Sequence, residues 1–499
     1  MLIVGAGQSG LGVGFGLRLE RIANVRIIDR RQRGFEGPWR GFARMKHLRT
    51  PKEVTGIDFG IPSLTVRAWY EEKFGRSAWD RIDTLPQEVW RSYLDWYRDV
   101  LDLPVENDVE LMLIEPADNN FLVHLRRSGG IERVHTRKIV LATGFEGSGS
   151  WRTPKSLVGC LSADLYAHSA DDIDFRKLKA KRIGILGTGA SAFDNAARAL
   201  EAGAARVDLC FRRSEMPRVN PLTWMNFVGM LGHFGELTDL DRWRFMRHIL
   251  EELPVPPTQD AYWRCRKFEN FDWHPNCNWS VVDEACGVVN VRSSDCSFEF
   301  DFIIFATGVE TDLSARPELV LFFEQIALWR DRFTPPPCEE SELLARYPYL
   351  GQAFEFTERR PGTAPFLRGI HNFTFGAFLS HGISGAAITG IKYGVRRLVN
   401  GIARDLFLED SANYYRDLLS YQTPELQTLD SAFVWLSQLG SDAANFDSFA
   451  NQLDQHQSAA LRGLLLRSTP RHDSPAAKSA RAARTKRTLR TTQLKKKGR

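Results

Sequence analysis

The sequence lacks the markers of several protein classes. Its seven cysteines form no Cys-x-x-Cys pair and no repeated spacing, which argues against the redox pair of a disulfide reductase and against a disulfide framework. No run of 18 apolar residues occurs, so no transmembrane helix is expected. The apolar start has no basic leader, which argues against a signal peptide and favours a cytoplasmic protein. It leaves open whether a few residues precede Met1. No metal site is expected either.

Positive charge is concentrated at one end of the chain. The formal net charge is +5, yet residues 468–499 contain 11 Lys or Arg against one Asp, so the rest of the chain is net acidic. This segment has few large apolar residues and is predicted to be disordered. No aromatic residues alternate with its basic ones, so we expect no specific nucleic-acid partner.

Two glycine-rich turns of the same design are present, GAGQSG from Gly5 and GTGASA from Gly187. Each follows an apolar strand, Leu2–Val4 or Arg182–Leu186, and precedes a helix rich in small residues. In such motifs the first glycine makes a tight turn, the second lets the backbone approach a pyrophosphate, and the third lets the helix pack on the sheet. Ala192 takes the third position of the second turn. Because the N–H groups of each helix start then face phosphates, the sequence predicts two dinucleotide sites.

The residues that end the next strands distinguish the two ligands. Val25–Ile28 is followed by Asp29, whose carboxylate can bind a ribose 2′-hydroxyl of FAD or NAD. Val207–Phe211 is followed by Arg212 and Arg213, and guanidinium groups fit a 2′-phosphate that an acid would repel. We assign FAD to the first site and NADPH to the second. A solvated basic turn is the alternative explanation of the two arginines.

The order of these segments predicts an α/β fold with two Rossmann-like dinucleotide-binding domains, the second inserted into the first. At 499 residues the chain suits two or three domains. An Ala-Thr-Gly sequence ends each nucleotide module, at Thr143–Gly144 and Thr307–Gly308. Periodicity predicts helices at 87–101 and 383–402, and an antiparallel meander near 111–126. The expected regions are an FAD domain in two parts (1–160 and 301–400), an NADPH domain (161–300) with an aromatic, mainly helical insert at about 214–279, a helical region (401–467) and the basic tail (468–499).

Together these motifs resemble the class B flavoprotein monooxygenases, which include flavin-containing monooxygenases, Baeyer–Villiger monooxygenases and lysine or ornithine N-hydroxylases. The resemblance covers roughly residues 1–400. Gly37–Trp39 is similar to a Gly-Gly-x-Trp segment near the FAD, and Leu48–Pro51 to an LRxP stretch of the amine hydroxylases. Leu379–Ser384 looks like the segment that brings a helix N-terminus to the flavin, where its positive end stabilises negative charge.

One family signature is incomplete. The Baeyer–Villiger and flavin-containing groups carry FxGxxxHxxx before the second turn, and here only His168 with Ser169 fits, since Ser162 and Asp164 replace Phe and Gly. This departure favours the N-hydroxylases. A linker histidine with a structural hydrogen bond is the alternative for His168.

The resemblance implies a cofactor-based reaction. NADPH would reduce FAD, and reduced FAD would react with O₂ to form a C4a-hydroperoxide that oxygenates a small molecule, with N-hydroxylation of an amine as first choice, then Baeyer–Villiger oxidation or S-oxidation. Aromatic residues of the insert, including Trp224, Phe227, His233 and Phe234, would help to exclude water. The alternative is an NADPH reductase or oxidase that passes electrons to a small acceptor or partner without oxygen insertion; a protein that only binds the nucleotides is more distant.

The residues expected at the site fall into two sets. Lys46, His47, Arg49 and His381 are catalytic candidates only because they flank segments expected to contact the flavin, and a structural role is the alternative for each. The partners implied are a small-molecule substrate and O₂, and the sequence leaves open whether the chain forms a homo-oligomer. The expected cofactor-binding residues are Gly5, Gly7, Gln8, Ser9, Gly10, Asp29, Arg30, Gly37, Trp39, Thr143, Gly144, Gly187, Gly189, Ala190, Ser191, Arg212, Arg213, Thr307, Gly308, Gly382 and Ser384.

Overall fold

The computed structural model describes residues 1–423, except 55, 119, 160, 294, 295 and 386, together with 425 and 426. The chain divides into two compact units, Met1–Asp410 and Ser411–Arg499. In the second unit the described residues include α15 (Ser411–Ser420). The expected basic tail at 468–499, and residues 427–467 of the expected helical region, lie outside the described residues.

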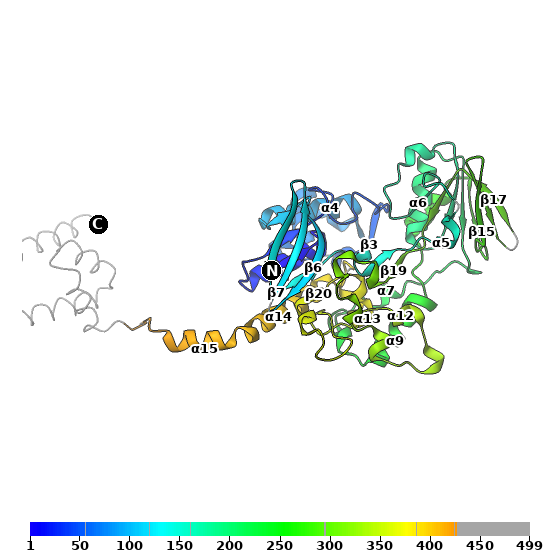
Figure 1. The fold of residues 1–499 in the computed structure, drawn as a ribbon. Helices are drawn as coiled ribbons and strands as arrows, with labels where there is room; N and C mark the ends of the chain where they lie inside the picture. The colour runs from blue at the N-terminus through cyan, green and yellow to red at the C-terminus, as the bar shows by residue number, and fades with distance from the viewer. Residues whose placement is uncertain are drawn as a thin grey trace, which may run out of the picture. The chain divides into compact units, whose positions relative to one another are not determined.

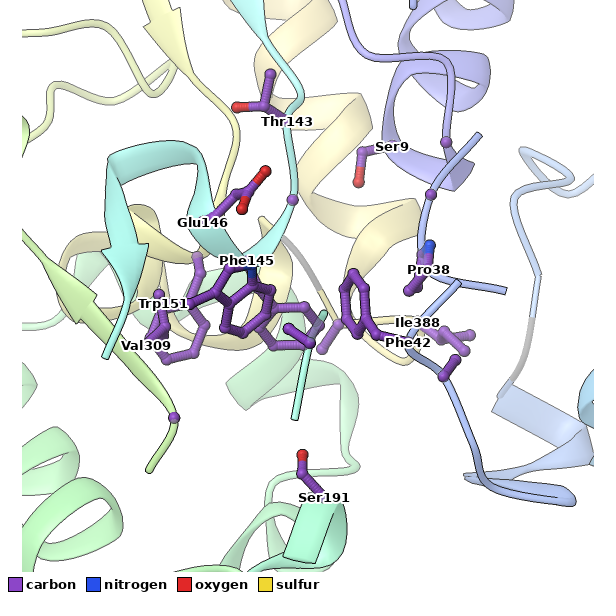
Figure 2. A pocket seen from close by; sticks show the side chains of 18 of the residues that line it. Ser9, Pro38, Phe42, Thr143, Phe145, Glu146, Trp151, Ser191, Val309 and Ile388 are labelled. Atoms are coloured by element: carbon purple, nitrogen blue, oxygen red, sulfur yellow. The ribbon is translucent and has the colours of Figure 1, made fainter. Parts of the chain in front are cut away.

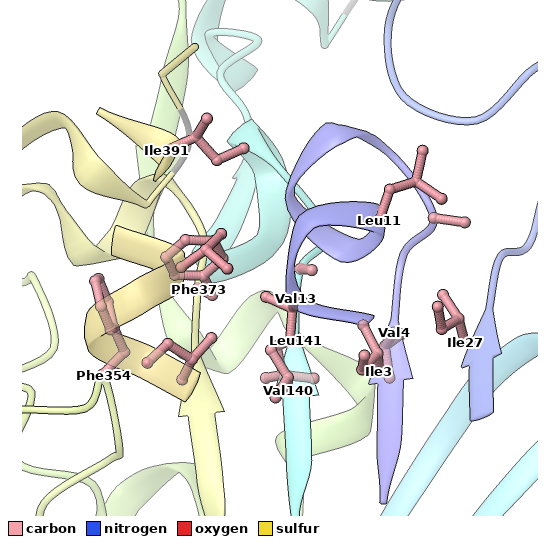
Figure 3. Close-up of a cluster of buried hydrophobic side chains, with 14 of the residues drawn as sticks. Ile3, Val4, Leu11, Val13, Ile27, Val140, Leu141, Phe354, Phe373 and Ile391 are labelled. Carbon is pink, nitrogen blue, oxygen red and sulfur yellow. The ribbon is translucent and has the colours of Figure 1, made fainter. Parts of the chain in front are cut away.

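The first glycine turn belongs to a five-stranded parallel sheet, of which Figure 1 labels the strand β20. In spatial order its strands are β20 (Ile370–Asn372), β9 (Ile139–Leu141), β1 (Leu2–Val4), β2 (Arg26–Ile28) and β5 (Val105–Glu106). The central strands β1 and β9 are short apolar runs because helices or loops cover both faces of a parallel sheet. Ile3, Val4 and Ile27 point into a core with Leu11 and Val13 of α1 (Gln8–Leu19), as Figure 3 shows.

Two further layers complete the first domain. α4 (Gln87–Val100) buries Trp90, Tyr93 and Tyr97, and β6 (Glu110–Ala117), β7 (Asn120–Arg127) and β8 (Gly130–Thr136) form an antiparallel meander. Both features confirm the sequence expectation. The remaining elements here are the β3–β4 pair (His47–Pro51 and Thr84–Pro86), α2 (Val66–Phe74) and α3 (Arg76–Asp80).

The second glycine turn belongs to another five-stranded parallel sheet. Its spatial order is β11 (Tyr166–His168), β18 (Phe302–Phe305), β12 (Arg182–Leu186), β13 (Arg206–Cys210) and β14 (Phe271–His274). α6 (Ala190–Glu201) follows the turn. An antiparallel sheet of β15 (Val281–Ala285), β16 (Val288–Arg292) and β17 (Ser297–Phe300) adjoins this module, and α5 (Lys155–Val158) precedes it.

Two expected boundaries differ from the structure. β14 pairs with β13, and α10 (Gln259–Arg266) packs on α6, so the end of the expected 214–279 insert is part of the nucleotide fold itself. β18 pairs with β12, so the second sheet continues past residue 300. The periodicity of the sequence did not predict either boundary, because these strand and helix pairings join segments that are far apart in the chain.

The insert proper consists of α7 (Pro221–Trp224), α8 (Val228–His233), α9 (Asp239–Arg247) and a π-turn at His248–Glu252. It shares a hydrophobic core with α11 (Trp329–Arg332), α12 (Glu342–Ala345) and α13 (Phe378–His381). The antiparallel pair β10 (Gly149–Trp151) and β19 (Val309–Thr311) joins the chain segments that link the two nucleotide modules.

The helix expected at 383–402 is α14, and it runs from Ile391 to Glu409. Gly382–Ser384 is a 3₁₀ turn, and a Cβ at Gly390 would lie 2.8 Å from the Ile383 carbonyl oxygen. The backbone therefore folds back on itself before the helix begins. No helix within the described ranges is both long and apolar enough to cross a membrane.

Candidate functional site

One cavity of about 1140 Å³ joins the two glycine turns. Figure 2 shows Ser9 of α1 on one side and Ser191 of α6 on the other, with the aromatic rings of Phe42, Phe145 and Trp151 between them. The cavity therefore connects the starts of the two helices that were expected to bind phosphates.

The structure brings most of the expected site residues together. Those that line the cavity are Gly5, Gly7, Gln8, Ser9, Asp29, Arg30, Gly37, Trp39, Arg49, Thr143, Gly144, Ala190, Ser191, Arg212, Arg213 and Gly308. Those outside its lining are Gly10, Lys46, His47, Gly187, Gly189, Thr307, His381, Gly382 and Ser384.

The glycines of the first turn have separable tasks. Gly5 has φ +100°, and a Cβ there would lie 2.5 Å from the Ala142 carbonyl oxygen. A Cβ on Gly10 would overlap the Gly5 carbonyl, so this glycine serves the packing of α1 against the turn. A Cβ on Gly7 would meet only Gly37, at 3.6 Å. Of the three, Gly7 is the one that lines the cavity and has space for a Cβ, as expected of the glycine that approaches the pyrophosphate.

The two Ala-Thr-Gly endings have the same geometry. Gly144 and Gly308 have φ values of +78° and +83°, and nothing lies within 4 Å of a Cβ built on either. In the second turn, Gly187 has φ +143° and a Cβ there would lie 2.5 Å from the Ala306 carbonyl oxygen. Each module thus pairs a crowded turn glycine with an open glycine on the cavity wall.

Asp29 braces the first turn. Its Oδ2 accepts a hydrogen bond from the Ala6 amide at 2.8 Å, and its Oδ1 accepts one from the Arg31 amide at 2.9 Å. Burial raises the pKa of this carboxyl, and the two amides oppose the rise. Arg30, next in sequence, forms an ion pair with Glu146 beside Gly144. The sequence indicated the ribose role of Asp29 but not this bracing role.

Several buried polar atoms on the cavity wall have no protein partner. Trp39 Nε1, Thr143 Oγ1 and Asn195 Oδ1 are each buried and without a hydrogen bond from the described residues. Buried polar groups are normally satisfied, so these atoms fit a ligand that supplies the missing partners. With the open glycines, they fit bound nucleotides at both turns.

The arginines after β13 differ in their freedom. Arg213 Nη2 donates to the Glu251 carbonyl oxygen in the insert at 3.0 Å. No side-chain partner for Arg212 is found in the described part of the chain. Both side chains line the cavity, so Arg212 is the more available of the two for an anionic group.

Three of the four catalytic candidates lie outside the cavity lining. Lys46 Nζ pairs with Glu201 at 3.2 Å, and His47 is exposed on β3. His381 is buried, its Nε2 lies 2.8 Å from the Gly351 carbonyl oxygen, and burial lowers its pKa to about 3, so the ring is neutral. Ser384 Oγ donates to the His381 carbonyl oxygen, which ties this segment to itself. Only Arg49 faces the cavity.

The aromatic residues expected to shield the site also lie outside its lining. Trp224 and Phe227 are 61% and 47% exposed, whereas Phe234 is buried in the core of the insert. The insert contributes Leu222, Asn226 and Leu250 to the cavity wall instead. Which residues of the insert reach the wall depends on how the helices pack and not on residue type.

Sequence reasoning missed Asp194 and Asn195, which line the cavity from α6. Burial raises the pKa of Asp194 to about 6, and Arg264 Nη1 lies 3.5 Å from its Oδ1. The sequence did contain a signal for them, because two polar residues within a helix of small apolar ones indicate a buried polar site. None of the described cysteines lines the cavity, so no dithiol lies there within the described residues.

Comparison with known proteins identifies the family. Residues 2–227 match the family model described as pyridine nucleotide-disulphide oxidoreductase. The chain is also 42% identical over 433 residues to an FAD-dependent urate hydroxylase from Xanthomonas campestris pv. campestris, covering 85% of this chain and 89% of that protein. The chain belongs to the class B flavoprotein monooxygenases. FAD and NADPH are accordingly the cofactors of this monooxygenase, as the two turns predicted.

Solved structures share the fold of the monooxygenase. An ornithine N-hydroxylase from Kutzneria sp. 744, solved with reduced FAD, NADP⁺ and L-ornithine, has a TM-score of 0.65 at 16% identity, over 81% of this chain and 98% of that one. An L-lysine 6-monooxygenase from Pseudomonas syringae has a TM-score of 0.59 at 15% identity with the same coverage. A bacillithiol disulfide reductase from Bacillus cereus is also similar, with a TM-score of 0.53 at 13% identity over 81% and 98% of the two chains.

Proposed function

We propose that this monooxygenase uses FAD, NADPH and O₂ to hydroxylate an oxidised purine of the urate class. The observation that carries the proposal is the 42% identity to a urate hydroxylase, which extends over 433 residues, 85% of this chain. The N-hydroxylases share the fold at much lower identity, and fold alone does not define a substrate.

The charges of the cavity also favour this substrate over an amine. In the described structure, each carboxylate side chain that lines the cavity already has at least one hydrogen-bond or ion-pair partner, which makes the cavity less suited to a substrate ammonium group. Asp29 accepts hydrogen bonds from two backbone amides, and Glu251 accepts one from Ser341. The other four carboxylates form ion pairs with arginines: Glu110 with Arg126, Glu146 with Arg30, Glu318 with Arg316 and Asp194 with Arg264. N-hydroxylation of an amine, our first expectation from the sequence, therefore becomes the second candidate.

The residues of the chain position the reactants and exclude water. The turns at Gly7 and Ser191 would hold the two nucleotides, and Thr143 and Trp39 offer hydrogen bonds to the FAD. The nicotinamide supplies hydride and the flavin activates O₂. Leu222, Leu250 and Leu343 form an apolar wall that limits water in the site.

The test is product formation with labelled oxygen. Purified protein is incubated with NADPH, ¹⁸O₂ and urate, and in parallel with ornithine, lysine, a thioether and a ketone. We expect one ¹⁸O atom in the urate product for each NADPH consumed. Labelled hydroxylamine from an amine would favour the N-hydroxylase assignment. Hydrogen peroxide equal to the NADPH consumed, without labelled product, would favour the oxidase alternative.

A further inference from the structure

We infer that Arg49 binds the negative charge of the substrate and selects anionic ring compounds over cationic amines. This inference rests on the proposed function and names the residue that would define its substrate class.

Arg49 is held at the cavity wall with part of its guanidinium unused. It lies in β3, where Leu48 and Thr50 line the same cavity. Its Nη2 donates to the Pro256 carbonyl oxygen at 2.7 Å, at the end of the insert. No partner for Nη1 or Nε occurs among the described residues. One hydrogen bond thus anchors the guanidinium at Nη2, while Nη1 and Nε remain available.

The positive charge of Arg49 has no paired counter-ion. No carboxylate lies within ion-pair distance of it in the described structure. Burial lowers the pKa of this guanidinium, and the charge of Asp194 only partly opposes the effect. A partly desolvated cation without a paired anion is costly, and a bound anion would offset that cost.

The neighbouring arginines are already committed. Arg44 donates to the carbonyl oxygens of Ser169 and Asp171, and its guanidinium lies 5.1 Å from the ring centroid of Phe175. Arg264 binds both oxygens of Glu201, at 2.9 and 3.0 Å. Of Arg44, Arg49 and Arg264, Arg49 is the one that lines the cavity and still has guanidinium nitrogens without a partner among the described residues.

The ligand that fits is a planar anion. A guanidinium presents parallel N–H groups that match two acceptors in one plane, as in a carboxylate or the O and N edge of an oxopurine anion. The phosphates of NADPH have other candidates, namely the start of α6 and Arg212. Arg49 comes from the FAD domain instead, two residues before Pro51 at the end of β3.

The test compares Arg49→Met, Arg49→Lys and Arg212→Ala in the FAD-loaded enzyme, with the exposed Arg360→Met as a surface control. We expect kcat/KM for urate to fall about 50-fold in Arg49→Met, as for a lost charge-assisted hydrogen bond, with partial recovery in Arg49→Lys. The KM for NADPH and the bound FAD should change less than about twofold. Arg212→Ala should show the reverse pattern. Urate binding, followed by calorimetry, should weaken in parallel, whereas an uncharged methylated oxopurine should bind wild type and Arg49→Met alike.

Two outcomes would overturn the inference. An unchanged urate affinity with a raised KM for NADPH would assign Arg49 to the nucleotide. An equal loss for the charged and the uncharged purine would assign it a structural role. If wild type neither binds nor converts urate, the proposed function fails by itself; the role of Arg49 is then judged by aromatic carboxylates, whose binding must weaken in Arg49→Met for the inference to stand.

Discussion

The Asp29 carboxylate accepts a hydrogen bond from the Ala6 amide, 2.8 Å away inside the first glycine turn. The acid at the end of β2 therefore fixes the loop whose outer side faces the cavity. Because a second amide, that of Arg31, binds the other oxygen at 2.9 Å, the carboxylate is oriented before any ribose reaches it. The shape of the turn thus depends on this side chain, and we expect nucleotide binding to depend on it as well.

Gly7→Ala should fold but bind FAD at least about tenfold more weakly. A Cβ at Gly7 meets the protein at an ordinary 3.6 Å, so the loss would come from blocking the pyrophosphate. The measurement is FAD content and affinity by flavin fluorescence. The matched control is Gly10→Ala, in which the Cβ overlaps the Gly5 carbonyl, so it should lower the melting temperature even without FAD. Full flavin content in Gly7→Ala would contradict the assignment.

Arg212→Ala should raise the KM for NADPH about tenfold and leave the KM for NADH unchanged, since only NADPH carries the 2′-phosphate. Arg213→Ala should affect both coenzymes, because Arg213 also holds the Glu251 carbonyl oxygen of the insert. Steady-state kinetics with both coenzymes provide the measurement. Equal use of NADPH and NADH by wild type, unaltered in Arg212→Ala, would refute the NADPH site.

Asp194 should make stability depend on pH. The pKa of its carboxyl is raised to about 6 in the folded protein, above the unfolded value, so the folded state holds the proton more tightly. The contribution of this group to the free energy of unfolding is therefore fully present below about pH 4 and is lost as the pH rises through about 6. Asp194→Asn removes this loss, which is about 3 kcal/mol if the other charges are unaffected. Relative to wild type, the variant should therefore gain stability between pH 4 and 7 in urea unfolding. A constant difference across that range would contradict the raised pKa.

His381→Gln should lower stability without altering proton chemistry. His381 lies against Phe354, with ring centroids 4.2 Å apart, and its pKa of about 3 keeps it neutral at working pH. We expect a melting temperature lower by a few degrees and an unchanged shape of the pH profile of kcat/KM between pH 5 and 8. Loss of an ionisation from that profile would restore His381 as a catalytic candidate.

The sequence could predict those parts of the site that are local in the chain. A strand, a glycine turn and a helix start lie within about a dozen residues, so the spacing of Gly5, Gly7 and Gly10 already fixes their geometry. The acid after β2 and the arginines after β13 could be predicted for the same reason, since each directly follows a strand that can be recognised in the sequence. Candidates chosen only for their closeness to a motif had mixed outcomes: Lys46 and His47 lie outside the cavity lining, whereas Arg49 is part of it.

The sequence by itself therefore determined that the chain has two nucleotide modules, because contiguous residues encode each turn, and it predicted FAD for the first module and NADPH for the second. Only the tertiary structure decided which side chains share the cavity between them. Arg49 and Asp194 line it from β3 and α6, and Arg49 is held by the carbonyl oxygen of Pro256, so the arrangement depends on how three segments far apart in the chain pack together. The same packing gives the carboxylates of the cavity hydrogen-bond or ion-pair partners and leaves the guanidinium of Arg49 available. This distribution of charge depends on contacts between distant segments and cannot be predicted from a local sequence pattern.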